Sequence, residues 1–219
     1  MNTRTSLHAI GWALCFAGSL CSNAGIFVDT TPGTAAPPGT LGGYSMGGFP
    51  VDLTPEGTMI NALAPPLLAP VAGNLTFNAA VEHDIIGSYW ATWSHGYAGD
   101  VYAYYGQDSQ LLMMLPAGTM AFSLYVEPNI FSTFEFEVDS GAAVATLNID
   151  GYAGAKYVGF YSDDPLQPLQ YVYVKQTTLS SDGFAVGEFM INVVPEPQTW
   201  GLVAGLGLAV LGVARRFRR

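Results

Sequence analysis

Alternation between apolar and polar residues constrains this chain more than any other feature of its sequence. In FEFEV (134–138) and YVYVK (171–175) every second residue is an apolar core former, and a β-strand places such residues on one face. Short runs rich in β-branched and aromatic residues recur from about Leu75 onward, separated by Gly, Pro, Asp and Asn. No window of this region shows the 3.6-residue period of an amphipathic helix. The body of the protein is therefore predicted to be all-β.

The spacing of these runs predicts how the strands are arranged. Strands that recur about every 10 to 15 residues, with turn formers between them, are typical of an antiparallel β-sandwich. We expect a jelly-roll-like sandwich over residues 74–193. The predicted strands are 75–81, 88–93, 100–105, 110–115, 120–126, 131–138, 143–149, 155–161, 169–178 and 184–193.

The segment before the sandwich has a different composition. Residues 25–73 are dense in Gly and Pro, which favour turns and extended chain over regular elements. We expect an N-terminal arm that wraps the domain and holds one short strand near Val51. Disorder is the alternative, although Phe49, Ile60 and Leu67 give the arm apolar side chains to bury.

Residues 1–24 predict a secretory signal peptide. Arg4 gives a basic start, residues 7–20 are almost wholly apolar, and small residues at the −3 and −1 positions place signal peptidase cleavage between Ala24 and Gly25. A permanent membrane helix is the alternative, but the run is short and no basic stop follows it. Cleavage removes both cysteines of the chain, so the mature protein has no thiol for a disulfide, a metal or nucleophilic attack.

Charge is segregated along the chain. All 17 acidic residues lie between Asp29 and Glu196, where Lys156 and Lys175 are the only lysines or arginines, so this segment has a formal charge of −15. Nucleic-acid affinity depends on Lys and Arg that displace counterions, which excludes nucleic acid as a partner. The acidic field favours solubility and attracts cations such as calcium.

Residues 194–219 contain three elements in a fixed order. Pro195-Glu196-Pro197 is stiff and extended, because each proline fixes its own φ and restricts the residue before it. Residues 200–214 carry no charge and predict a single transmembrane helix of roughly 22 Å, short of the ~30 Å hydrocarbon core unless interfacial Trp200 and snorkelling arginines make up the difference. A basic cluster then holds the tail on the cytoplasmic side: Arg215, Arg216, Arg218 and Arg219.

This order resembles the PEP-CTERM sorting domain of Gram-negative, often biofilm-forming bacteria. The resemblance implies that an exosortase, an integral-membrane transpeptidase with a cysteine nucleophile, recognises Pro195-Glu196-Pro197 and cuts near it. The protein would then pass through the inner membrane to the cell surface or the extracellular polymeric matrix. A plain tail anchor is the alternative, but it needs the helix and the arginines without Pro-Glu-Pro.

The body also resembles a recurrent all-β domain of PEP-CTERM proteins. The resemblance covers roughly residues 40–190 and implies the same sorting route and a sandwich fold, without a catalytic assignment. Its carrying segments are WATWSHGYAGDVY (90–102), LPAGTMAFSLYVEPN (115–129), GYAGAKYVGFY (151–161) and GFAVGEF (183–189).

Candidate catalytic residues do not form a known pattern. Glu82-His83-Asp84 and Ser94-His95, with Asp100 further on, contain the residue types of a triad or metal site, but at no hydrolase or zinc spacing. Glu135 and Glu137, with Asp139 beyond them, share a strand face at ~7 Å, which suits a glycosidase. The same alternation also makes them a solvated face opposite phenylalanines. We therefore expect no enzyme, with a glycan hydrolase as the weakest alternative.

Two binding sites are better candidates. Oxygen-rich loops at Asp163-Asp164, Asp150-Gly151, Asp182-Gly183 and Glu127 suit calcium, although Asp-Gly pairs are first of all turn formers; no other cofactor is expected. A ligand site at Trp90, Trp93, His95 and Tyr97, with Tyr102, Tyr104 and Tyr105 nearby, would suit stacking on exopolysaccharide sugars. The same aromatics also suit a sandwich core.

Overall fold

The computed structural model describes residues 25–106, 109–178 and 181–193. The predicted signal peptide, the Pro-Glu-Pro motif and the predicted tail helix lie outside these residues. Within the described ranges, no helix has the length and apolarity needed to cross a membrane. The strands are β1 (Ile26–Asp29), β2 (Thr40–Leu41), β3 (Tyr44–Gly48), β4 (Thr58–Leu63), β5 (Leu75–Ile85), β6 (Asp100–Tyr104), β7 (Gln110–Met114), β8 (Ala121–Pro128), β9 (Thr133–Asp139), β10 (Val144–Asp150), β11 (Lys156–Ser162), β12 (Tyr171–Gln176) and β13 (Phe184–Asn192).

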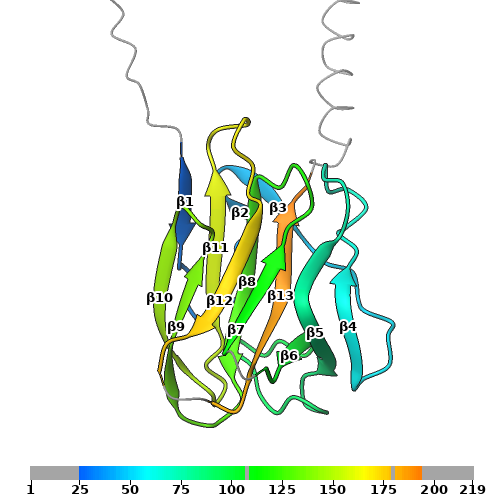
Figure 1. Ribbon diagram of the computed structural model, residues 1–219, viewed down its shortest axis with the longest axis vertical. Helices are drawn as coiled ribbons and strands as arrows, with labels where there is room; N and C mark the ends of the chain where they lie inside the picture. The colour runs from blue at the N-terminus through cyan, green and yellow to red at the C-terminus, as the bar shows by residue number, and fades with distance from the viewer. Residues whose placement is uncertain (1–24, 107–108, 179–180, 194–219) are drawn as a thin grey trace, which may run out of the picture.

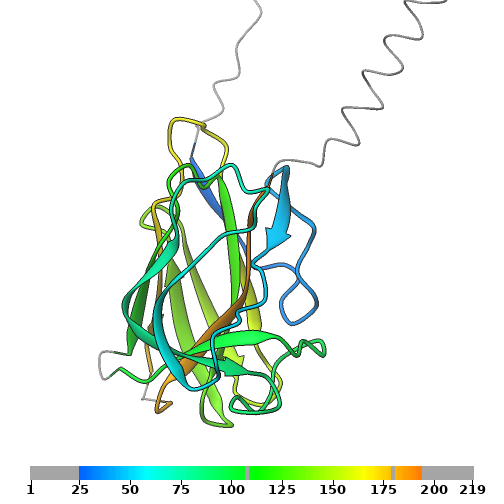
Figure 2. The same ribbon diagram turned by 90° about the vertical axis from the view of Figure 1, so that its right-hand side faces the viewer.

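The strands form one antiparallel sheet that curves almost back on itself into a barrel-like shape (Figures 1 and 2). The hydrogen-bonded order is β1-β11-β8-β13-β6-β5-β7-β12-β9-β10, with β3 paired to β13 and β4 paired to β5 beside this path. The prediction of an all-β antiparallel body is thus confirmed. The two separate sheets of a jelly-roll sandwich are not seen, because the ladder continues from one side of the core to the other.

Strand β5 explains why the sheet does not divide. Its first residues, Thr76 and Phe77, pair with β7, whereas residues 82–85 near its end pair with β6. One long strand therefore belongs to both sides of the core and connects them. Alternation in the sequence identifies strands and their inward faces, but it does not reveal that one strand has different neighbours at its two ends.

Nine of the ten predicted runs contain strands of the sheet, and residues 88–93 are the exception. That run lies in the loop between β5 and β6, where Ile86 and Trp90 form only an isolated bridge. Its aromatic residues reflect burial without a strand, since Trp90 and Trp93 turn inward from an irregular backbone and are 4% and 5% exposed.

The segment 25–73 contributes more regular structure than its composition indicates. Strands β1, β3 and β4 pair with β11, β13 and β5 of the body, and β2 pairs with β3. Val51 is 75% exposed and lies in the loop between β3 and β4, so no strand forms there. Pairing with strands of the body supplies the order that Gly and Pro do not favour locally.

Strand β8 is buried along its whole length, which is unusual where side chains alternate between two faces. Phe122, Leu124 and Val126 point into the main core. On the opposite face, Tyr125 packs with Trp90 and Trp93 in a second cluster. The β5–β6 loop therefore covers the outside of the sheet, and this covering layer carries the polar groups described next.

Candidate functional site

The β5–β6 loop holds two carboxylates of the sheet through its tryptophans, the buried Glu127 and the partly buried Glu188. Trp90 Nε1 donates to Glu127 Oε2 over 2.9 Å, and Trp93 Nε1 donates to Glu188 Oε2 over 3.3 Å. Glu127 lies at the end of β8 and Glu188 lies within β13. The two predicted ligand-binding tryptophans thus come together, but their buried rings leave little face for a sugar to stack on.

Glu127 of β8 contacts two loops at one point. Its side chain is fully buried, and Oε1 accepts the Gly154 main-chain N–H over 3.2 Å and lies 3.3 Å from the Thr92 hydroxyl. Burial raises the pKa of Glu127 to about 7, although the hydrogen bonds from Trp90, Gly154 and Thr92 act in the opposite direction. The carboxyl therefore titrates near neutrality and ties the β5–β6 and β10–β11 loops to β8.

Glu188 and His95 form the second polar contact. His95 Nε2 lies 2.9 Å from Glu188 Oε1, and both residues have positive φ, 43° and 51°, a conformation that costs energy in non-glycine residues. Glu188 sits where the register of β13 against β8 shifts, so a β-bulge turns its side chain toward the loop. Burial raises the pKa of Glu188, opposed by the charge and hydrogen bond of His95.

His95 also links this loop to the N-terminal segment. Its Nδ1 lies 3.0 Å from Ser94 Oγ and 3.2 Å from the Thr34 carbonyl oxygen. Ser94, His95 and Glu188 therefore include the residue types of a serine-nucleophile site. However, Ser94 is only 2% exposed, so its hydroxyl is closed to a substrate in this conformation. The arrangement instead fixes the loop between the sheet and residues of the arm.

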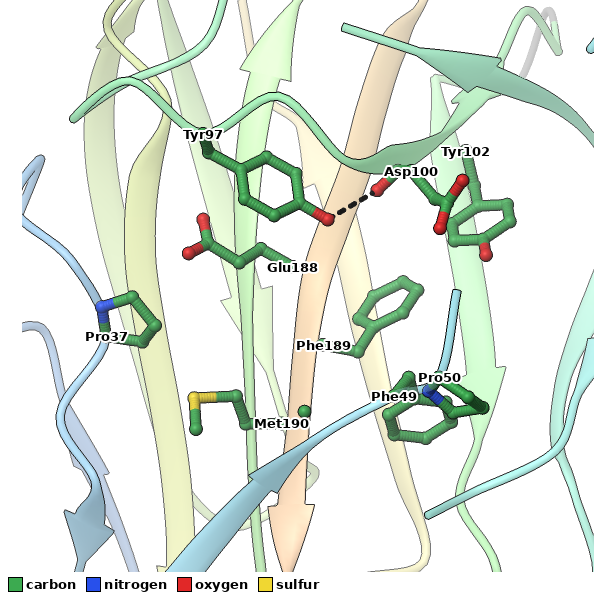
Figure 3. A pocket seen from close by; sticks show the side chains of 10 residues that line it. Pro37, Phe49, Pro50, Tyr97, Asp100, Tyr102, Glu188, Phe189 and Met190 are labelled. Carbon is green, nitrogen blue, oxygen red and sulfur yellow. Dashed lines mark hydrogen bonds between the residues drawn. The ribbon is translucent and has the colours of Figure 1, made fainter. Parts of the chain in front are cut away.

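A pocket of about 220 Å³ opens beside Glu188 (Figure 3). Asp100 forms one wall, and both its carboxylate oxygens are engaged within the protein: Oδ1 lies 2.9 Å from His83 Nε2, and Oδ2 accepts the Asp52 N–H over 3.0 Å. Tyr97 donates its hydroxyl to the Asp100 carbonyl oxygen over 3.1 Å. The lining is otherwise mostly apolar: Pro37, Gly48, Phe49, Pro50, Tyr102, Phe189 and Met190.

The motif Glu82-His83-Asp84 separates into different environments. Burial alone would lower the pKa of His83, but the hydrogen bond to Asp100 and the charge of Asp52 outweigh it and raise that pKa. Asp84 is 1% exposed and its Oδ1 has no hydrogen-bond partner among the described residues. Burial and the charges of Glu82 and Glu56 raise the pKa of Asp84 to about 6. His83 and Asp84 thus do not act on a common group.

An exposed aromatic rim lies at the loop end of β8. We define it as Tyr89, Phe131 and Tyr152, which are 63%, 59% and 65% exposed. Phe131 and Tyr152 meet edge to face at 5.5 Å. Tyr89 and Phe131 border a hollow of about 170 Å³, which is also lined by Thr92, Asn129 and Gly151. The rim was not predicted. Its signal in the sequence is weak: an aromatic residue closely follows a turn at 128–131 and again at 151–152.

The remaining predicted site residues lie elsewhere. Glu135 and Glu137 lie on the outward face of β9, alternating with the buried Phe136 and Val138. Thr177 donates its hydroxyl to Glu135 Oε1 over 2.6 Å, and Glu137 stands opposite Lys175 in the sheet. The paired carboxylates are thus part of the outer surface of the sheet.

The predicted calcium residues accept main-chain hydrogen bonds. Asp163 Oδ1 accepts the Gly25 N–H over 2.7 Å, and Asp164 Oδ1 accepts the Leu166 N–H over 2.9 Å. Across the part of the chain that the structure describes, no group of three or more His, Cys, Asp or Glu side chains is placed to hold a metal ion.

Comparison with protein families identifies the end of the chain. A family described as the PEP-CTERM protein-sorting motif matches residues 193–219. No curated protein matches the chain. The sorting motif predicted from Pro195-Glu196-Pro197 is therefore confirmed, and it implies an exported protein that an exosortase processes.

Proposed function

Because the chain ends in a PEP-CTERM sorting motif, we propose that it works as a non-catalytic protein of the cell surface or extracellular matrix. PEP-CTERM proteins are exported and sorted to the surface of Gram-negative bacteria, and the match over residues 193–219 is the observation that carries the proposal. In transit the C-terminal segment holds the protein in the inner membrane, and exosortase processing then releases the body.

The polar groups of the body support a structural role. Glu127 and Glu188, whose pKa values are raised as those of catalytic acids often are, are held by tryptophan and main-chain donors from covering loops. Ser94 is buried. Groups of this kind fix loops on a sheet, and they leave little reactive surface for a substrate.

The test of sorting is the double substitution Pro195→Ala with Glu196→Ala. Without the stiff motif, the protein should remain in the inner membrane with its C-terminal segment attached. The matched control is Pro55→Ala with Glu56→Ala, the same dipeptide in a loop of the body, which should be processed like the wild type. Intact-mass analysis of membrane and surface fractions distinguishes the two. Normal processing of the motif variant would contradict the proposal.

The aromatic rim favours a second function, carbohydrate binding. Exposed aromatic side chains expose apolar surface to water at a cost, unless a ligand covers them. The adjoining hollow of about 170 Å³ is smaller than the roughly 300 Å³ at which pockets for drug-sized ligands begin, so it suits one sugar ring of a longer chain. The acidic body favours uncharged or basic sugars over anionic ones.

Affinity electrophoresis in gels that contain neutral polysaccharide, or the host's own exopolysaccharide, tests this function with and without calcium. Phe131→Ala and Tyr152→Ala should each abolish retardation, since both side chains are exposed and their loss does not open the core. Leu166→Ala removes a side chain that is 88% exposed elsewhere and should leave retardation unchanged. Equal mobility of all four proteins with and without polysaccharide would exclude the rim as a glycan site.

A further inference from the structure

The first residue of the predicted mature protein is already bound in the fold. Gly25 N donates to Asp163 Oδ1 over 2.7 Å, and Asp163 N donates back to the Gly25 carbonyl oxygen over 3.2 Å. Asp163 directly follows β11, whose last residue, Ser162, pairs with Ile26 of β1. The reciprocal contact therefore closes the end of the β1–β11 ladder.

Cleavage by signal peptidase changes the chemistry of this contact. Hydrolysis of the Ala24–Gly25 peptide bond adds the hydroxyl of water to the Ala24 carbonyl carbon and leaves a carboxylate there. The Gly25 nitrogen leaves as an amine and takes up a proton. A free α-amino group has a pKa of roughly 7.7–8.0, so the new terminus is mostly a cation at neutral pH, where the precursor has a neutral amide.

We propose that Asp163 is the binding site for the mature N-terminus and that processing converts the Gly25–Asp163 hydrogen bond into an ion pair. This inference rests on the export part of the proposed function. A charge-assisted hydrogen bond is roughly twice as strong as a neutral one, and the nitrogen and oxygen already lie at hydrogen-bond distance before the charge appears. No rearrangement of the loop is needed.

The surroundings favour this pairing. The turn after β11 carries two charged side chains, Asp163 and Asp164, and Asp164 Oδ1 is engaged with the Leu166 N–H. Lys156 lies at the opposite end of β11, so it does not compete for Asp163. Among the described residues, strand β1 pairs with β11 alone, and the pair of Gly25 with Asp163 holds its first end. The same acidic turn that suggested calcium in the sequence would thus bind the chain's own ammonium group.

The experiment uses the protein recovered after export, with its N-terminus determined by intact mass. NMR titration of the Gly25 α-carbon should give an amine pKa above roughly 8 in the wild type and within the roughly 7.7–8.0 range in Asp163→Asn. Thermal unfolding adds a second measurement: Asp163→Asn should lower the midpoint at pH 7 and have a smaller effect at pH 10, where the amine is neutral.

Asp139→Asn is the matched control, because Asp139 Oδ1 accepts the N–H of Gly141, an internal residue, over 2.5 Å. Its effect should be equal at pH 7 and pH 10. Identical amine titration in the wild type and Asp163→Asn would overturn the inference while leaving export intact. A mature terminus other than Gly25 would overturn the cleavage position and the inference together, whereas the sorting proposal depends separately on the Pro195 and Glu196 variants.

Discussion

Replacement of Glu127 by glutamine should remove a large part of the pH dependence of stability. In the folded protein the pKa of Glu127 is raised to about 7 from the ordinary 4.5. A group with a raised carboxyl pKa stabilises the fold fully below its unfolded pKa, and this contribution is lost as pH rises through the folded pKa. The interval from 4.5 to about 7 corresponds to about 3 kcal/mol, since one pKa unit is about 1.4 kcal/mol.

Urea unfolding of the processed protein between pH 4 and pH 8 measures this difference. The wild type should lose about 3 kcal/mol more unfolding free energy over that range than Glu127→Gln. At pH 4 the variant should be less stable by about 1–3 kcal/mol, because one amide oxygen cannot replace both carboxyl oxygens as acceptors for Trp90, Gly154 and Thr92. Glu137→Gln on the outward face of β9 is the control and should follow the wild-type pH dependence. If Glu127→Gln runs parallel to the wild type from pH 4 to pH 8, the assigned raised pKa is wrong.

Three further predictions concern the fold that carries these groups. Asp84→Asn should stabilise the protein at pH 8 by up to about 3 kcal/mol and have little effect at pH 4, because the pKa of Asp84, about 6, lies above the ordinary 3.8. Urea unfolding measures both effects, and an equal change in unfolding free energy at pH 4 and pH 8 would refute the prediction. Gly151→Ala should lower the thermal midpoint, because the added methyl group would overlap the Ile130 carbonyl oxygen, whereas Gly39→Ala, which meets nothing within 4 Å, serves as its control. Leu124→Ala should cost about 2–5 kcal/mol by opening a cavity in the main core, and a urea midpoint unchanged from the wild type would place Leu124 outside that core.

Strand positions could be predicted from the sequence because alternation follows directly from burial on one face. In β9, Phe136 and Val138 are fully buried while Glu135 and Glu137 face outward, as FEFEV indicates. The barrel-like closure could not be predicted in the same way. It depends on β5 having β7 as its neighbour near Thr76 and β6 near Ile85, and a single strand's own sequence carries no record of its partners.

The sequence indicates the aromatic residues of the candidate site but not the acidic residues that they contact. The sequence around Trp90 and Trp93 suits either a ligand site or a sandwich core, and in the structure both rings are buried and donate to carboxylates. The partners are Glu127 and Glu188, which lie 37 and 95 positions from their tryptophans. Glu127, in a turn-like VEPN, stands out in the sequence only as an oxygen ligand for calcium, and Glu188 follows glycine without any such signal. Long-range pairing of this kind is set by strand order, which the local pattern leaves open.

Both ends of the described body emerge at one pole of the sheet (Figure 1). Gly25 is joined to Asp163 there, and Asn192, next to Val193, accepts the Met120 N–H through its side chain. The aromatic rim belongs to the opposite pole, where Pro128 of β8 pairs with Phe184 of β13, and the nine residues of β13 span roughly 30 Å between the two. A protein tethered through its C-terminal side would therefore present the rim outward. Sequence changes in those distal loops could alter what the protein contacts without altering the sorting motif that an exosortase recognises.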